Sequence, residues 1–160
     1  MKKVLLSMLL ALVGVASASA QFESGKKYLG MSLNGLDISY SEHTNFHLGL
    51  STKAGYMIDD DLLLIGDLGF EYRNKDAQQI ILGAAGRYFI EQNGIFLQVG
   101  AHYVHEAPKF NDVTITPEVG YCFFVNRHLT LEPSVYFDMS LTSFSVKSKF
   151  GLKLGLGWYF

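Results

Sequence analysis

Residues 46–56 read Phe-His-Leu-Gly-Leu-Ser-Thr-Lys-Ala-Gly-Tyr, with large or apolar side chains at almost every second position. Successive side chains of a β-strand point to opposite faces of the sheet, whereas those of a helix repeat about every 3.6 residues. The alternation therefore predicts a strand with one apolar face and one face that carries His47, Ser51 and Lys53 between glycines.

The same alternation recurs along the rest of the chain. Six further segments show it: 62–72, 80–90, 95–105, 113–123, 129–139 and 150–160. None of their apolar-phase positions holds Asp, Glu, Lys or Arg, although 18% of the chain is charged. With a first strand near residues 28–40 the count reaches eight. An even number of antiparallel strands closes without a free edge, so we expect an all-β, eight-stranded antiparallel up-and-down barrel.

The polar face of these segments collects the charged side chains. We expect nine of them to point into the lumen and form an ion network: Lys53, Asp67, Glu71, Arg73, Arg87, Glu118, Glu132, Asp138 and Lys153. Charges in a low-dielectric interior must pair, which favours a network that plugs the narrow barrel among Gly, Ser and Thr side chains. The alternative is a narrow polar conduit.

Two kinds of closed barrel produce this alternation. A secreted, soluble barrel that binds an apolar ligand has its apolar face inside, and a membrane barrel has it outside, against lipid. An eight-stranded barrel is too narrow to hold Phe70, Tyr88, Phe137 and Trp158 together with the many aliphatic side chains. A Lys or Arg facing lipid costs about 2–4 kcal/mol near the midplane, which explains the missing charges. We therefore expect a transmembrane barrel, with the soluble barrel as the alternative.

Aromatic residues mark the strand ends. Tyr56, Tyr88, Tyr121 and Trp158 lie on the apolar track near the end of every second strand. Compact turns follow the first three, at 59–61, 91–94 and 126–128. Since a bilayer interface selects aromatic side chains, we expect these four to form an aromatic girdle.

The first 20 residues have the pattern of a secretory signal peptide. Lys2 and Lys3 precede an apolar run, and residues 18–20 (Ala-Ser-Ala) offer the small side chains that signal peptidase requires. We expect residues 1–20 to be removed and residues 21–160 to form the barrel domain. Cys122 is the only cysteine, which excludes a disulfide within the chain, and 13 basic against 15 acidic residues leave no basic patch for nucleic acid.

Three segments carry a resemblance to a known family. Residues 55–62 read Gly-Tyr-Met-Ile-Asp-Asp-Asp-Leu, residues 120–129 read Gly-Tyr-Cys-Phe-Phe-Val-Asn-Arg-His-Leu, and residues 155–160 read Gly-Leu-Gly-Trp-Tyr-Phe. Residues 21–160 thereby resemble the small outer-membrane β-barrel proteins of Gram-negative bacteria, especially the barrel-domain proteins common in Bacteroidetes. That family includes structural, adhesive and porin-like members.

The resemblance implies residence in the bacterial outer membrane and contact with its lipid. It also implies that the barrel-assembly machinery recognises the alternating residues of the last strand: Leu154, Leu156, Trp158 and Phe160.

Two prolines are unfavourable in regular strands. Pro117 and Pro133 fall inside the sixth and seventh expected strands, where each lacks a ladder donor. We expect local bulges at both positions.

Candidates for catalysis and metal binding are sparse. Residues of the types found in lipid-modifying outer-membrane enzymes would lie near the outer rim: Ser41, His43, His105, Glu106 and Ser143. No motif of those enzymes accompanies them, so an enzyme is the weaker alternative. His47 and His102, on different strands, make a metal site weaker still. We expect no catalytic residue, cofactor or metal, and a monomeric, non-enzymatic barrel with an envelope-structural or narrow-pore role.

Overall fold

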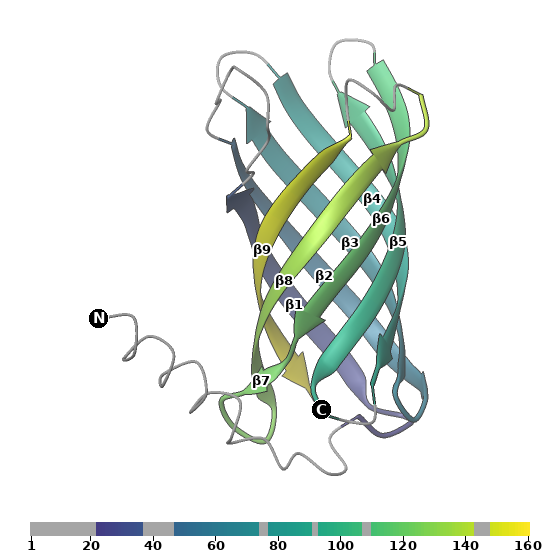
Figure 1. Ribbon diagram of the computed structural model, residues 1–160, viewed down its shortest axis with the longest axis vertical. Helices are drawn as coiled ribbons and strands as arrows, with labels where there is room; N and C mark the ends of the chain where they lie inside the picture. Colours follow the sequence, from purple (N-terminus) through teal and green to yellow (C-terminus); the bar gives the residue numbers. More distant parts are fainter. Residues whose placement is uncertain (1–21, 37–46, 74–76, 91–92, 107–109, 143–147) are drawn as a thin grey trace, which may run out of the picture.

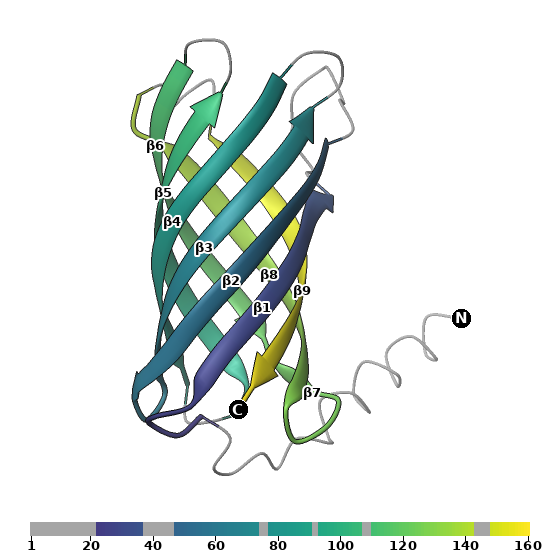
Figure 2. The ribbon, with the colours of Figure 1, turned by 180° about the vertical axis from the view of Figure 1, so that it is seen from behind.

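The computed structural model describes residues 22–36, 47–73, 77–90, 93–106, 110–142 and 148–160. These residues form tilted antiparallel strands that wind around a closed barrel (Figures 1 and 2). The strands are β1 (Lys27–Leu36), β2 (His47–Asp59), β3 (Leu62–Arg73), β4 (Ala77–Phe89), β5 (Ile95–Glu106), β6 (Phe110–Tyr121), β7 (Phe123–Phe124), β8 (Leu129–Ser140) and β9 (Lys149–Tyr159).

The described residues contain no helix that is long and apolar enough to cross a membrane.

The barrel wall consists of eight strands, although nine strands are numbered. Each strand from β1 to β5 pairs with the next, β8 pairs with β6 and β9, and β9 pairs with β1, which closes the sheet. The two-residue β7 pairs with β8 in the same register as β6 does, with Gly120 opposite Ser134 and Phe123 opposite Leu131. β6 and β7 are therefore one strand, interrupted at Cys122. The predicted eight-stranded antiparallel barrel is confirmed.

The apolar track faces outward. Leu68, Leu82 and Val99 are 59%, 57% and 59% exposed, respectively, whereas Arg87 is 1% exposed on the inner face. A soluble barrel with an apolar interior would show the reverse, so that alternative is wrong. An outer surface of this kind is the one that lipid tails cover in transmembrane barrels.

The two prolines do not form the bulges we expected. Pro117 and Pro133 pair in unbroken ladders with Val99 on β5 and Leu154 on β9. On their other side, the β6–β8 ladder has gaps at residues 116–117 and 121–122, and its register is the same on both sides of each gap. A missing N–H removes one hydrogen bond from this seam without requiring an extra residue. Register shifts occur instead at Asn34/Leu36 and Met57/Asp59.

Candidate functional site: the barrel lumen

The deepest polar contact in the lumen joins β4 to β8. Arg87 Nη1 lies 2.8 Å from Glu132 Oε2, with both side chains buried. Tyr28 donates to the same oxygen at 2.9 Å, and Thr130 donates to Glu132 Oε1 at 2.8 Å. The Arg87 guanidinium also lies over the Phe96 ring, 4.0 Å from its centroid. Tyr159 also donates to Glu132 Oε1, at 3.5 Å. The carboxylate thus has a charged partner and three hydroxyl donors, which is what a buried ion pair requires.

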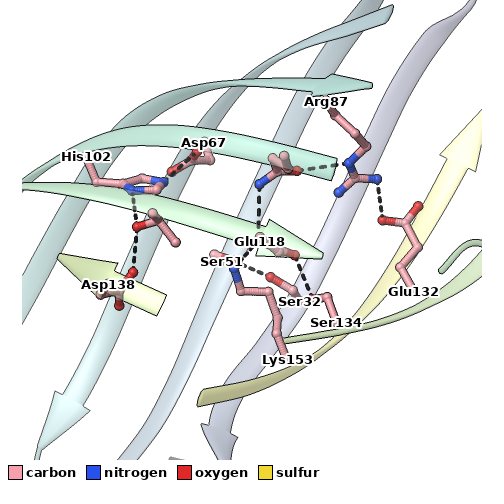
Figure 3. A network of polar contacts seen from close by, with 12 residues as sticks. Ser32, Ser51, Asp67, Arg87, His102, Glu118, Glu132, Ser134, Asp138 and Lys153 are labelled. Carbon is pink, nitrogen blue, oxygen red and sulfur yellow. Dashed lines mark hydrogen bonds and ion pairs between the residues drawn. The ribbon is translucent and has the colours of Figure 1, made fainter. Parts of the chain in front are cut away.

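A second cluster surrounds Glu118 on β6. Its Oε2 accepts from Lys153 Nζ at 2.8 Å and from Gln98 Nε2 at 3.1 Å, and its Oε1 accepts from Ser134 at 2.6 Å. Gln98 Oε1 in turn accepts from Arg87 Nε at 2.9 Å. Gln98 therefore connects the two clusters into one chain of contacts across the lumen. Figure 3 shows Arg87 and Glu118 at the two ends of this connection.

A third cluster is centred on His102 of β5. Its Nε2 lies 3.2 Å from Asp67 Oδ2, and its Nδ1 lies 3.1 Å from Thr116 Oγ1, which donates to Asp138 Oδ1 at 2.5 Å. The ring fits because its neighbours on β4 and β5 are glycines. A Cβ on Gly83 would come within 2.2 Å of His102 Cδ2. Figure 3 shows His102 between Asp67 and Asp138.

The structure thus locates most of the nine charged residues assigned to the lumen. It brings Arg87 to Glu132, and Lys153 to Glu118. Lys53 is buried and lies opposite Asp67 in the β2–β3 register, and Asp138 accepts a hydrogen bond from Thr116. The side chains of Glu71 and Arg73 lie outside the described residues.

Sequence reasoning left several members of these clusters unassigned: Tyr28, Gln98, Thr116, Thr130 and Ser134. Gln98 stands in the inward phase between two outward-facing apolar residues, so parity alone could have placed it in the lumen. Parity places Thr116, Thr130 and Ser134 in the lumen in the same way, but it does not indicate which carboxylate each hydroxyl contacts.

At the end of the barrel with the short turns, the lumen is apolar. We call this region the cup. It is formed by buried side chains: Met57, Leu63, Ile65, Phe89, Phe96, Cys122 and Tyr159. The expectation that small residues and charged side chains fill the lumen is therefore wrong for this end. Runs of neighbouring apolar residues, such as Leu62–Ile65 and Tyr88–Ile90, signal it, because both faces of the strand are then apolar.

The residues of the expected girdle lie near the same end of the barrel. Tyr56, Tyr88 and Trp158 face outward and are 49%, 50% and 46% exposed, respectively. Tyr121 is half-buried and packs against Phe123, with the ring centroids 4.3 Å apart. The residues of the expected assembly signal, on β9 and directly after it, also face outward: Leu154, Leu156, Trp158 and Phe160.

The remaining candidates do not assemble into a reactive site among the described residues. His105 Nδ1 lies 2.8 Å from Asn111 Oδ1. Ser41, His43, Ser143 and the side chains of His47 and Glu106 fall outside the described part of the chain. Within that part, no group of three or more His, Cys, Asp or Glu side chains is placed to hold a metal ion.

Comparison with known proteins gives likenesses in structure. No protein-family model matches the sequence, and neither does any curated protein. Neisserial surface protein A has 17% identity and a TM-score of 0.62, over 86% of this chain and 98% of that chain. Ail of Yersinia pestis, in a phospholipid bilayer nanodisc, has 14% identity and a TM-score of 0.60, over 86% of this chain and all of that one. The N-terminal β-barrel domain of Pseudomonas aeruginosa OprF has 15% identity and a TM-score of 0.56, over 86% and 98% of the two chains.

At these identities the likeness shows the fold. Together with the exposed apolar belt, it defines the class: a small transmembrane β-barrel of the outer-membrane type. This is the fold of bacterial outer-membrane proteins, in agreement with the localisation expected from the sequence. The narrower likeness to barrels of Bacteroidetes stays a prediction.

Proposed function

We propose that the protein is a non-enzymatic, envelope-structural barrel of the bacterial outer membrane whose lumen is closed to solutes. One observation carries this proposal: the buried Arg87–Glu132 pair crosses the lumen directly beside the apolar cup. A passing ion would have to break this pair and then cross a region lined by aromatic and aliphatic side chains. Both steps are costly in a low-dielectric interior.

The second cluster supports a closed lumen rather than a conduit. Glu118 has a charged partner in Lys153 and two neutral donors in Gln98 and Ser134. Side chains that satisfy one another across the barrel leave few polar atoms free to replace the hydration shell of a solute. The network therefore favours the structural role over the narrow-pore role.

Export and assembly complete the proposal. A leader of residues 1–20 would direct the chain across the inner membrane, and residues 21–160 would then insert as a monomer. The outward-facing residues at the C-terminal end of the chain, Leu154, Leu156 and Trp158 of β9 and the following Phe160, would be recognised by the barrel-assembly machinery. Apart from that machinery, we expect lipid as the partner, and neither nucleic acid nor a cofactor.

Fractionation combined with bilayer recording tests the proposal. The protein should sediment with the outer membrane and migrate differently on gels before and after boiling. Purified protein in planar bilayers should show no steady conductance step, and the gel shift of protein recovered from the same vesicles controls for correct insertion. Steady single-channel steps would contradict the closed lumen, and recovery in the soluble periplasm would contradict the localisation.

A further inference from the structure

A short segment ahead of the first strand enters the cup. Residues Phe22–Lys26, which we call the strap, precede β1, and the Phe22 side chain is fully buried. By contrast, Glu23, Ser24 and Gly25 are exposed. The strap therefore presents one aromatic ring to the interior and Glu23, Ser24 and Gly25 to solvent, and Lys26 is half-buried.

The ring of Phe22 packs against three other aromatic rings. It stacks on Phe89 of β4 with the centroids 3.7 Å apart and an interplanar angle of 12°. It meets Tyr159 of β9 edge-on at 5.7 Å and Phe124 of β7 at 5.4 Å. These partners come from strands distributed around the barrel, so the ring sits across the opening of the lumen rather than beside one strand.

The backbone of the strap is tied to β2 and to the turn that follows it. Gly25 N donates to Met57 O at 2.9 Å, and Asp61 N donates to Phe22 O at 3.1 Å. Ser24 N donates to Asp60 Oδ1 at 2.9 Å. Gly25 has a φ of 90°, which lets the strap turn sharply between the cup and β1.

We propose that the strap is a stopper: it closes the turn end of the lumen and can leave the cup while the barrel stays intact. The ladders that close the barrel do not include residues 22–26. Opening would therefore cost the contacts of one ring and a few backbone hydrogen bonds, and no strand would have to unpair. Segments held in this way open locally, well below the free energy of global unfolding.

Cys122 provides an intrinsic reporter of the stopper. It is the only cysteine, it is fully buried, and it belongs to the same apolar cluster as Phe22. Its backbone is fixed by the bond from its N–H to Gly94 O at 2.8 Å, and its Sγ lies 4.0 Å from Tyr159 Oη. Alkylation of this thiol therefore requires that the cup be open to water.

The test measures how fast iodoacetamide alkylates the folded protein in detergent micelles, by mass spectrometry. Wild type should react slowly, and Phe22→Ala should react at least tenfold faster. Phe70→Ala is the matched control, because it removes the same ring from the lipid-facing surface of β3 and should react like wild type. The gel shift on boiling reports folding for every variant, and unfolded protein shows that the thiol itself is reactive.

A second variant leaves the ring in place. A Cβ on Gly25 meets only Tyr56 Oη, at 3.9 Å, so Gly25→Ala acts through backbone strain at positive φ. The strain disfavours the closed strap relative to the open one, and alkylation proceeds through the open state. This variant should therefore react about tenfold faster than wild type. It keeps the proposal testable if Phe22→Ala fails to fold.

Two results would overturn the stopper: rapid alkylation of wild type, or folded Phe22→Ala and Gly25→Ala proteins as protected as wild type. The proposal is separable from the closed lumen. Fast alkylation of Phe22→Ala without conductance supports both proposals. Slow alkylation of both folded variants without conductance contradicts the stopper alone and leaves the closed lumen standing, whereas steady conductance of wild type contradicts the closed lumen.

Discussion

The guanidinium of Arg87 lies 2.8 Å from the carboxylate of Glu132, on strands that are not neighbours in the barrel. β4 and β8 are separated by β5 and β6, so this ion pair links the barrel through its interior. Both side chains are almost completely buried, at 1% and 3% exposure. The pair thus links two distant strands through the lumen. The effect of substitutions on stability should depend on whether one or both charges are removed.

Removing one charge should destabilise the barrel strongly. Arg87→Met or Glu132→Leu leaves the other charge buried without a partner, which costs roughly 3–5 kcal/mol. The double variant replaces both charges with apolar groups and should recover most of that loss, because no uncompensated charge remains. Urea unfolding followed by Trp158 fluorescence measures all four proteins. Additive losses would show that the two groups act independently.

The room around His102 gives a prediction about packing. Gly83→Ala would place a Cβ 2.2 Å from His102 Cδ2 and 2.8 Å from Asp67 Oδ1. Overpacking of this kind costs about 1–3 kcal/mol. The loss should be smaller when His102 is already alanine, because the closest clashing group is gone and only the contacts with Asp67 Oδ1 and the Ala101 carbonyl remain. Thermal unfolding of the double-mutant cycle measures this coupling.

Gly86 supplies the control for Gly83. It lies on the same strand but faces outward, and a Cβ there meets nothing within 4 Å. Gly86→Ala should therefore leave stability nearly unchanged. If Gly86→Ala is as damaging as Gly83→Ala, loss of glycine flexibility rather than the His102 clash explains the effect.

The inward or outward direction of a strand residue could be predicted from parity alone. Arg87 and Glu132 were both assigned to the lumen in this way. Their contact could not be predicted, because the height of a residue in a barrel depends on strand tilt and stagger, which one sequence does not specify. The same limit applies to Lys153 and Glu118.

Other features of the structure could not be predicted because their residues do not show the two-residue alternation of a strand. Met57, Phe89 and Phe96 lie in the inward phase, but their neighbours are apolar too, so the contrast between faces disappears at the cup. Phe22 precedes the first strand and has no parity at all. The prediction of bulges at Pro117 and Pro133 is wrong for a different reason. A proline removes a backbone donor from the ladder, whereas a bulge requires an extra residue in the strand.

Lipid contact predicts a dependence on depth. Leu82 lies near the middle of β4 and Ile58 lies next to the turn after β2, and their exposed fractions are similar, 57% and 52%. Leu82→Arg should cost about 2–4 kcal/mol in bilayers, whereas Ile58→Arg should cost about 0–1 kcal/mol. Reversible unfolding from lipid vesicles measures both variants. Equal losses would contradict the orientation of the barrel in the membrane.

Asp61 gives a prediction about pH. It lies in the turn between β2 and β3 with a φ of 68°, and its Oδ1 is buried without a hydrogen-bond partner among the described residues. Desolvation, together with the neighbouring Asp60 and Asp59, raises the pKa of its carboxyl group. A raised pKa means that the charged form is less favourable in the folded protein than in the unfolded chain. The charge therefore destabilises the fold above this pKa, and the penalty disappears as pH falls below the ordinary carboxyl pKa of about 3.9.

Asp61→Asn should accordingly stabilise the barrel at pH 7, with a gain that shrinks towards zero in acid. Asn keeps the left-handed backbone conformation accessible, so the substitution removes the charge without adding strain. Asp61→Gly provides the matched control, because it also tolerates this φ and removes the side chain entirely; it should show the same pH trend. Urea midpoints measured between pH 7 and pH 3.5 report both variants. A gain in Asp61→Asn that is equally large at both ends of this range would rule out the charge as its cause, and would point instead to the unpartnered oxygen or to the turn backbone.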